Sequence, residues 1–310
     1  MIIELPKTDT TSISASLASA RENYSLATSR VLTLLVAIDD SDERGIDEAL
    51  SMLRSASFEH PARVLVLVTG DPHAPTQLDA EVLIAADAGA SEVVVMRLRG
   101  DLTANLDSVV TPLLLPDTPI VSCWPALSPP RPAAAQLGRI AQRRITNLRR
   151  DPAAPPLVRL VNDYQPGDSD MMWSRITPWR GTVASALDRF PGRAVTGAEI
   201  AGAEGDPSVD IAAGWLASCL GVDVARHTAS AAGGFPIAHL ALHCEGGDIE
   251  VAVQGEHTVR ISVPGRADSF VAMGERTDAE CLAEELRHLG PDATYERALR
   301  GLERVQYQGV

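Results

Sequence analysis

Short, continuous apolar runs in the first half of the chain limit its fold more than any other feature. Residues 31–38 read Val-Leu-Thr-Leu-Leu-Val-Ala-Ile, and residues 63–68 form a second run. Runs of this length are typical of strands that are buried on both faces, as in parallel sheets. Between them, apolar residues recur at helical spacing over residues 46–53. Strand, helix and strand in turn predict an open, largely parallel, Rossmann-like sheet with helices on its faces.

The same alternation continues to about residue 150. Residues 78–88 fit a strand or a helix, and we favour the strand. Residues 127–156 are rich in proline, alanine and arginine, which is typical of a covering segment that connects two domains. We therefore expect an α/β domain at 1–153 and a second domain at 154–310. The other elements expected in the first domain are a polar helix at 12–29, strands at 92–98 and 120–123, and a helical stretch at 102–114.

The second half of the chain has a different pattern. Alternating apolar residues between 237 and 272 are separated by turn sequences such as Glu245-Gly246-Gly247-Asp248 and Val263-Pro264-Gly265-Arg266. They predict an antiparallel meander with one buried and one exposed face. A capping box at Thr277 predicts a helix that ends at Gly290. Further helices are expected at 171–188, 209–220 and 293–305. The second domain is therefore expected to be α+β.

Charge and composition exclude several classes of function. The chain has 310 residues and a net charge of −14, which repels nucleic-acid phosphates and anionic lipid. It has no apolar stretch of membrane-spanning length and no signal-peptide pattern, so we expect a cytoplasmic protein. The four cysteines are far apart and lack metal-ligand spacing, which predicts free, buried thiols. They are Cys123, Cys219, Cys244 and Cys281.

Lys7 is the only lysine of the chain, and it is placed in an expected N-terminal tail. Mechanisms that need a positioned lysine are therefore excluded. They include the lysine of a nucleotide-binding P-loop, Schiff-base chemistry and lysine-assisted proton transfer. The sequence indicates no catalytic residue, no cofactor site and no metal site.

Two clusters of metal-binding residue types have simpler explanations. Asp40 and Asp42, after the first apolar run, could hold magnesium, but acids and a serine at this place are typical of a helix N-terminus. His239 and His243 are four residues apart. On the strand expected here their Cα atoms are about 13 Å apart, which is too far for one metal ion. We interpret them as surface histidines.

The most unusual stretch is Trp173-Ser174-Arg175-Ile176-Thr177-Pro178-Trp179-Arg180, which holds two of the four tryptophans of the chain. We call it the Trp/Arg string. Thr177 can cap a helix that begins at Pro178, and Arg175 and Arg180 can stack on indole rings. Two interpretations stay open at this point. The string is either a structural anchor or a binding hot spot, since Trp and Arg are enriched in both settings.

Arginines also gather between residues 131 and 150. This basic island is a solvated face that balances acids elsewhere, or a docking patch for an acidic partner or a sugar phosphate. If it is a docking patch, Arg143→Glu with Arg144→Glu should weaken partner binding in a salt-sensitive way and leave the fold intact. Its members are Arg131, Arg139, Arg143, Arg144, Arg149 and Arg150.

The Trp/Arg string resembles the signature of the OpcA family, whose C-terminal domain it opens. Segments at 30–34, 59–64, 115–120 and 215–217 agree with the family in the same order. The resemblance implies a protein that promotes the assembly or activity of glucose-6-phosphate dehydrogenase and so supports the oxidative pentose phosphate pathway and NADPH supply. Partner binding would then involve Trp173, Arg175, Thr177, Pro178, Trp179, Arg180, Arg139, Arg143 and Arg144.

Three classes of function fit the sequence. They are a regulatory partner protein, a lysine-independent sugar-phosphate enzyme such as a lactone hydrolase, and a small-molecule sensor. We favour a non-catalytic partner that acts as an allosteric activator of glucose-6-phosphate dehydrogenase. The sequence leaves open its own oligomeric state and the face that docks.

Overall fold

The chain forms two compact units in the computed structural model, which describes residues 2–24, 30–41, 43–84, 92–151, 157–230 and 235–308. Unit 1 consists of Met1–Ala154, Gln165–Met171 and Asp278–Pro291. Unit 2 consists of Pro155–Tyr164, Met172–Thr277 and Asp292–Val310. Each unit is thus built from several stretches of the chain. The sequence-based division between residues 153 and 154 stays a prediction.

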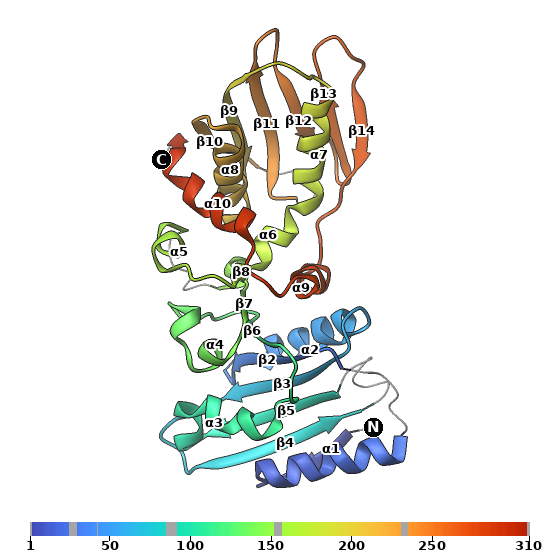
Figure 1. The fold of residues 1–310 in the computed structure, drawn as a ribbon, viewed down its shortest axis with the longest axis vertical. Coiled ribbons are helices and arrows are strands. Elements are labelled where there is room, and N and C mark those ends of the chain that lie inside the picture. The colour runs from blue at the N-terminus through green and yellow to red at the C-terminus, as the bar shows by residue number, and fades with distance from the viewer. Residues whose placement is uncertain are drawn as a thin grey trace. The chain divides into compact units, whose positions relative to one another are not determined.

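Unit 1 contains an eight-stranded sheet in the order β1-β4-β5-β3-β2-β6-β7-β8 (Figure 1). In this order, the neighbouring strands β5, β3, β2, β6, β7 and β8 are parallel. Strand β4 pairs with β5 in antiparallel orientation, and β1 pairs with β4 in the same way at the edge. This confirms the expected, largely parallel α/β sheet. The strands are β1 (Ile2–Leu5), β2 (Leu32–Asp39), β3 (Ala62–Thr69), β4 (Gln77–Leu83), β5 (Glu92–Arg99), β6 (Ile120–Trp124), β7 (Arg143–Thr146) and β8 (Asp168–Asp170).

Apolar cores lie on both faces of this sheet. Leu34 and Val36 of β2 belong to one core, and Leu35 between them belongs to the other. The first core includes residues of α2 and α9, and the second includes residues of α1 and α3. The helical elements of unit 1 are α1 (Thr10–Tyr24), α2 (Glu43–Ser57), η2 (Gly100–Ala104), α3 (Leu106–Val110), η3 (Thr111–Leu113), η4 (Pro132–Ala134), α4 (Gln136–Ile140), η5 (Leu148–Arg150) and α9 (Asp278–Arg287).

Unit 2 contains a seven-stranded sheet in the order β14-β13-β12-β11-β9-β10-β15. The meander from β11 to β14 is antiparallel as expected, whereas β9, β10 and β15 are parallel neighbours. The strands are β9 (Val195–Gly202), β10 (Val224–Thr228), β11 (Ile237–Cys244), β12 (Ile249–Val253), β13 (Thr258–Ser262), β14 (Ser269–Ala272) and β15 (Val305–Gln308). The helical elements are α5 (Leu157–Asp163), α6 (Met171–Arg175), α7 (Thr177–Asp188), α8 (Pro207–Leu220), α10 (Ala293–Gly301) and η6 (Leu302–Arg304).

The turns of the meander have the predicted chemistry. Gly246 and Gly247 connect β11 to β12 with φ angles of 98° and 131°, a region that side chains with a Cβ rarely adopt. Gly265 has a φ of 73°, and Arg266 N donates to Val263 O at 3.1 Å in the expected type II turn. In the part of the chain that the structure describes, no helix has the length and apolar character needed to cross a membrane.

Candidate partner-binding site

Trp173 of the Trp/Arg string joins two helices within unit 2. The side chain is buried on α6, and its indole Nε1 donates to Asp292 Oδ2 at 2.8 Å. The other carboxylate oxygen of Asp292 accepts from the backbone N–H groups of Thr294 and Tyr295 and so caps α10. The Tyr295 ring lies 5.7 Å from the Trp173 ring, centroid to centroid. One tryptophan therefore connects α6 to the start of α10 through a hydrogen bond and a ring contact.

Arg180 stacks on Trp173 as the sequence suggested. Its guanidinium carbon is 3.4 Å from the centroid of the Trp173 ring, a cation–π geometry. The same guanidinium donates to Thr177 Oγ1 at 2.7 Å and to Trp173 O at 3.3 Å. Thr177 is the first residue of α7, and the capping position is held by Ile176. The expectation that Thr177 caps this helix is therefore wrong.

The other members of the string are also held by the fold. Arg175 is buried, pairs with Glu275 at 3.4 Å and donates to Arg276 O. Trp179 is buried in an edge-to-face contact with Trp215 of α8, at 6.0 Å between ring centroids. Pro178 is exposed. The surface that the string offers to a partner therefore consists of Pro178 and parts of the half-buried Thr177 and Arg180.

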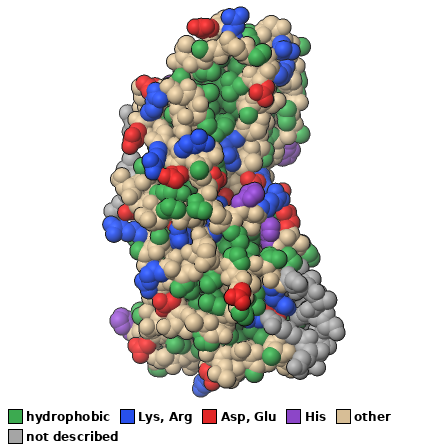
Figure 2. Space-filling model, in the orientation of Figure 1, with side chains coloured by type: hydrophobic (Ala, Val, Ile, Leu, Met, Phe, Trp, Pro, Cys, Tyr) green, Lys and Arg blue, Asp and Glu red, His purple; other side chains and the backbone are tan. Residues whose placement is uncertain are grey.

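The basic island of unit 1 is not one solvated face. Arg139 on α4 is largely exposed and pairs with Asp107 at 3.2 Å. Arg143 and Arg144, by contrast, are buried on β7. This corrects the interpretation of these two residues as a solvated face or a docking patch. On the molecular face drawn in Figure 2, basic and acidic side chains are interspersed.

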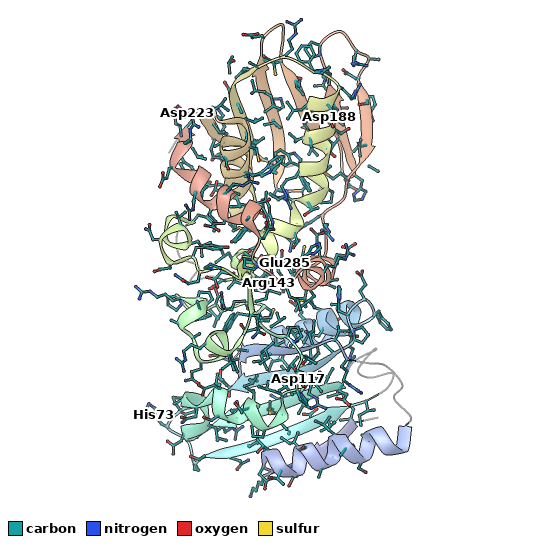
Figure 3. All side chains as sticks on the ribbon, viewed as in Figure 1. His73, Asp117, Arg143, Asp188, Asp223 and Glu285 are labelled. Atoms are coloured by element: carbon teal, nitrogen blue, oxygen red, sulfur yellow. The ribbon has the colours of Figure 1, made fainter. Side chains whose placement is uncertain are left out.

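Buried carboxylates neutralise both arginines within unit 1. Arg143 forms an ion pair with Glu285 of α9 and donates to Gly290 O at 2.9 Å, and Figure 3 shows this pair. Arg144 pairs with Asp168 and donates to Pro166 O at 2.6 Å. Glutamates at both positions would place like charges together in the core. The expectation that Arg143→Glu with Arg144→Glu leaves the fold intact is therefore wrong.

The sequence did not reveal the partners of these arginines. Glu285 is 142 residues from Arg143 along the chain, and it also accepts from Ser169 Oγ at 2.6 Å. Asp292 is 119 residues from Trp173. Neither acid belongs to a motif or stands at a spacing that identifies its partner. The only local sign that these two arginines lie on a strand was the pair Ile145-Thr146 that follows them, because isoleucine and threonine favour strands.

The acidic turn after β2 has a structural explanation. Asp39 accepts from the backbone N–H of Ser41 at 3.0 Å and from its hydroxyl. The hydroxyl and then the backbone hydrogen bond hold the pKa of Asp39 below its ordinary value. Asp42, the second carboxylate of the possible magnesium pair, lies outside the described residues. No group of three or more His, Cys, Asp or Glu side chains that could hold a metal ion occurs among the described residues.

The thiols are free, and they differ in exposure. Cys123 and Cys281 are buried as expected, but Cys219 is exposed and Cys244 is intermediate, so the prediction of four buried thiols is wrong for these two. Burial raises the pKa of the Cys123, Cys219 and Cys244 thiols above the ordinary value. Such thiols are protonated near neutral pH and are weak nucleophiles.

His243 lies on the exposed face of the unit 2 sheet beside two carboxylates. Its Nδ1 is 3.1 Å from Asp248 Oδ2, and its Nε2 is 3.3 Å from Glu199 Oε1. The hydrogen bond with Asp248 is the main cause that raises the pKa of His243 above its ordinary value. A raised pKa means that the fold favours the protonated ring. The ring therefore stabilises the fold below about pH 6.5, and this contribution is lost as the pH rises through the folded pKa.

We expect an NMR titration to give His243 a pKa above about 6.5, the value of an unperturbed histidine. Asp248→Asn should move this pKa back toward the unperturbed value, because the substitution removes the nearest negative charge. A pKa of His243 at or below about 6.5, or one that Asp248→Asn leaves unchanged, would contradict the geometry.

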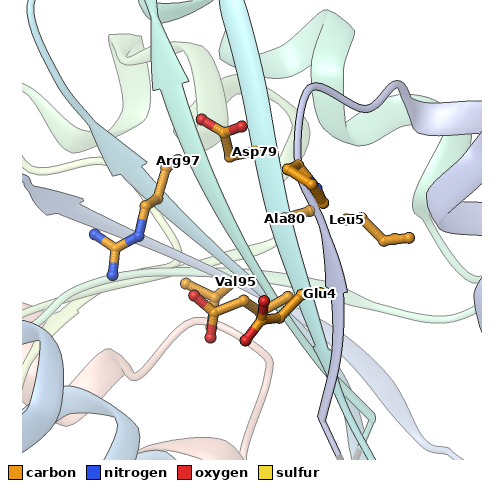
Figure 4. A pocket seen from close by; sticks show the side chains of 8 residues that line it. Glu4, Leu5, Asp79, Ala80, Val95 and Arg97 are labelled. Atoms are coloured by element: carbon orange, nitrogen blue, oxygen red, sulfur yellow. The ribbon is translucent and has the colours of Figure 1, made fainter.

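A small pocket in unit 1 has the wrong charge for a phosphate ligand. It has a volume of about 160 Å³ and lies along β1, β4 and β5 (Figure 4). Glu4, Asp79 and Glu81 line it together with a single cation, Arg97. Backbone and side-chain hydrogen bonds from Lys7 and Gln77 lower the pKa of Asp79, which keeps it charged. An anionic lining of this kind repels a sugar phosphate.

Two family models match the chain. Residues 53–161 match the model described as the N-terminal domain of the glucose-6-phosphate dehydrogenase subunit. Residues 166–299 match the model described as the C-terminal domain of the same kind of protein. The second match contains the whole Trp/Arg string. No curated protein matches the sequence.

Several solved structures are similar at low identity. A glucose-6-phosphate 1-dehydrogenase from Mycobacterium avium is 9% identical, with 90% of this chain and 94% of that chain covered and a TM-score of 0.43. An oxidoreductase from Sinorhizobium meliloti is 10% identical, with 89% and 95% covered and a TM-score of 0.41. A Gfo/Idh/MocA family oxidoreductase from Vibrio cholerae is 9% identical, with 88% and 95% covered and a TM-score of 0.36. Scores of this size do not establish a shared fold.

Proposed function

The chain belongs to the OpcA family of glucose-6-phosphate dehydrogenase subunits, and from this membership we propose that it is a non-catalytic partner that binds and activates this dehydrogenase. The observation that carries the proposal is the pair of family matches, which follow each other along the chain and cover both compact units in large part. In this role the protein supports the oxidative pentose phosphate pathway and NADPH supply in the cytoplasm.

The placement of the single lysine supports a role without catalysis. Lys7 is exposed in the turn between β1 and α1, and its backbone N–H donates to Asp79. A catalytic lysine acts from a desolvated or charge-coupled position, where its pKa is shifted. The anionic pocket in unit 1 also opposes a phosphate-bearing substrate. Neither feature favours the lactone-hydrolase alternative.

The exposed parts of the two arginine-rich elements are the proposed contacts with the dehydrogenase. They are Pro178 and Arg180 in unit 2 and Arg139 in unit 1. The buried Trp173 acts indirectly, because it holds Arg180 in place. Arg180 is the strongest single candidate, since it is half-buried on an indole ring and still reaches the surface.

We expect Arg180→Ala to weaken binding of the dehydrogenase by about 5-fold or more, which corresponds to a hot-spot loss of more than about 1 kcal/mol. Affinity and melting temperature should be measured on the same samples. The matched control is Arg189→Ala, which removes the same side chain at the end of the same helix. If Arg180→Ala lowers the melting temperature but binds like the unaltered protein, the arginine is a structural anchor and not a contact.

Binding itself is tested by mixing purified chain with the dehydrogenase of the same organism and measuring the mass of the complex by light scattering. We expect a species heavier than either protein alone. Two separate peaks at concentrations of tens of micromolar would contradict the proposal, because physiological partners with weak, transient interfaces still associate in this range.

A further inference from the structure

In the described part of unit 2, helices cover one face of the sheet and no helix covers the other. Helices α7, α8 and α10 lie on the covered face, where α8 packs on β9 and β10 (Figure 1). The residues that point to these helices are buried, for example Ile200 and Leu240. Their neighbours along the same strands point to the second face and range from the exposed Glu199 to Ala241, which is buried at 9%. This second face is called the open face below.

The register of the strands arranges the open face in two straight rows. Ala225, Glu199 and Ala241 are neighbours on adjacent strands, and the row continues through Glu250 to Ser262. We call these five residues row 1. Two residues away on each strand, the pairing defines a second row parallel to the first. Row 2 consists of His227, Ala201, His239, Ala252 and Arg260.

The two rows are complementary in size. In each of the five strands, one row holds a small residue and the other a longer polar residue. On β9 the longer residue is Glu199 in row 1, opposite Ala201 in row 2 of the same strand, and on β11 the order is reversed. The complete pairs are Ala225 with His227, Glu199 with Ala201, Ala241 with His239, Glu250 with Ala252, and Ser262 with Arg260.

The rows are also complementary in charge. The longer residues of row 1 are both carboxylates, Glu199 and Glu250. The longer residues of row 2 are two histidines and Arg260. Both carboxylates reach solvent, with Glu199 about half exposed (51%) and Glu250 at 42%. Within one chain, Glu199 lies 3.6 Å from His227 and 3.3 Å from His243, and Glu250 pairs with Arg260 at 3.0 Å. An acidic row thus runs beside a basic row across the whole width of the five strands.

We propose that the open face binds the same face of a second copy of this chain, related by a two-fold axis that runs between the rows. Such a rotation places row 1 over row 2 of the second copy, so that every longer residue meets a small one. Along the contact, basic and acidic side chains then alternate. Their order is His227 of the second copy, Glu199, His239 of the second copy, Glu250 and Arg260 of the second copy.

The spacing of the strands suits this contact. Adjacent strands are about 4.8 Å apart, so neighbouring opposite charges in the combined row are at ion-pair range. Two packed sheets cross at about 30° because each is twisted. The alternation therefore fits best at the central strands β9, β11 and β12. Small side chains at Ala201, Ala241 and Ala252 leave room for the longer residues of the second copy.

Area and charge favour a second copy over an unrelated occupant. Seven strands of about five residues each give the face a flat area of about 600 Å². Side chains that interdigitate increase the area buried on each copy. The total then approaches about 800 Å² per partner, the size of a standard interface. The whole chain carries a charge of −14 and repels itself elsewhere. The open face mixes both signs, and it is therefore a place where two copies can meet.

The first experiment compares two alanine-to-arginine variants by sedimentation velocity, without any dehydrogenase present. Ala241 is at the centre of the open face between Glu199 and Glu250, so a new arginine there finds acids in its own chain but blocks the second copy. Ala184 is exposed on α7 and provides the control with the same added charge. We expect dimers for the unaltered chain and for Ala184→Arg, and monomers for Ala241→Arg.

The second experiment exchanges the charges between two chains. Glu199→Arg should not dimerise with itself, because it opposes the histidines of row 2. The double variant His227→Glu with His239→Glu should not dimerise with itself either, because it opposes Glu199. Mixed in equal amounts, the two variants should form a dimer again. In one contact row the arginine introduced at position 199 then lies between the two introduced glutamates, and Glu250 keeps Arg260 of the other chain as a neighbour. The other contact row is unaltered. Melting curves confirm that each variant is folded.

Three results would overturn the proposal. The first is an unaltered chain that stays monomeric at about 100 µM, because a dimer with a Kd in the low micromolar range is mostly formed at this concentration. The second is a dimer that Ala241→Arg leaves intact. The third is a mixture of the exchanged variants that stays monomeric. If the chain is monomeric and Ala241→Arg abolishes binding of the dehydrogenase, the dehydrogenase occupies the face and the proposed function stands without the dimer.

Discussion

Arg143→Ala is expected to lower the free energy of unfolding of unit 1 by about 3–5 kcal/mol, the largest effect of any single substitution considered for this unit. The arginine and its partner Glu285 are both only 3% exposed. Removing one member leaves the other charge buried without its counterion, and this costs far more than the pair contributes when both are present. The loss should be visible as a lower urea midpoint.

Arg139→Ala is the matched control for Arg143→Ala. Arg139 is four residues away and also pairs with a carboxylate, but its side chain is 56% exposed. Exposed ion pairs contribute about 0–1 kcal/mol because water and salt screen them. Equal urea midpoints for the two variants would mean that Arg143 is not buried against Glu285 in solution.

Trp173→Ala should destabilise unit 2 by about 3–5 kcal/mol, since it removes a large buried side chain from a packed cluster. Trp173→Phe separates the two contributions of the indole. Phenylalanine keeps an aromatic ring beside Tyr295 and under Arg180, but it cannot donate to Asp292. The loss of that hydrogen bond to a charged group should cost about 1.5–3 kcal/mol.

Thermal unfolding of both Trp173 variants decides between the anchor and the hot-spot interpretations of this residue. The structure favours the anchor, because the ring is only 3% exposed and connects α6 to α10. If Trp173→Ala has the melting temperature of the unaltered protein but no longer binds the dehydrogenase, the ring is a contact residue and does not stabilise the free chain.

Local patterns were sufficient for the elements whose residues match their environment. The apolar run at 31–38 became β2, with both faces buried, because alternate residues enter two different cores. The glycine turns predicted the meander from β11 to β13 because such short connections permit only antiparallel neighbours. These features depend on interactions between residues that are close in sequence.

Long-range partners explain what the sequence did not reveal. Strands β7 and β8 read Arg-Arg-Ile-Thr and Asp-Ser-Asp, and both are buried although most of their residues are polar. Their burial depends on the pairs Arg144 with Asp168 and Arg143 with Glu285. No local rule predicts a buried strand from charged residues, so the segment at 127–156 was interpreted as a connection only. Strands β9, β10 and β15 were missed because parallel neighbours need no turn signal.

The candidate site was found by composition and corrected by geometry. The density of Trp and Arg marked residues 173–180 as unusual, and the stacking of Arg180 on Trp173 followed from residue type alone. Composition could not distinguish exposed arginines from buried ones. Arg139 and Arg143 differ by four positions in sequence and have opposite environments, because only the second points toward α9.

In the function proposed above, this chain activates glucose-6-phosphate dehydrogenase without catalysing the reaction itself. The most direct test adds increasing amounts of the purified chain to the dehydrogenase at limiting substrate and follows the initial rate of NADPH formation. We expect a saturable increase of about 5 to 150-fold, the range of ordinary allosteric coupling, and no turnover by the chain alone. An unchanged rate at a saturating amount of the chain, or NADPH formation without the dehydrogenase, would contradict the claim.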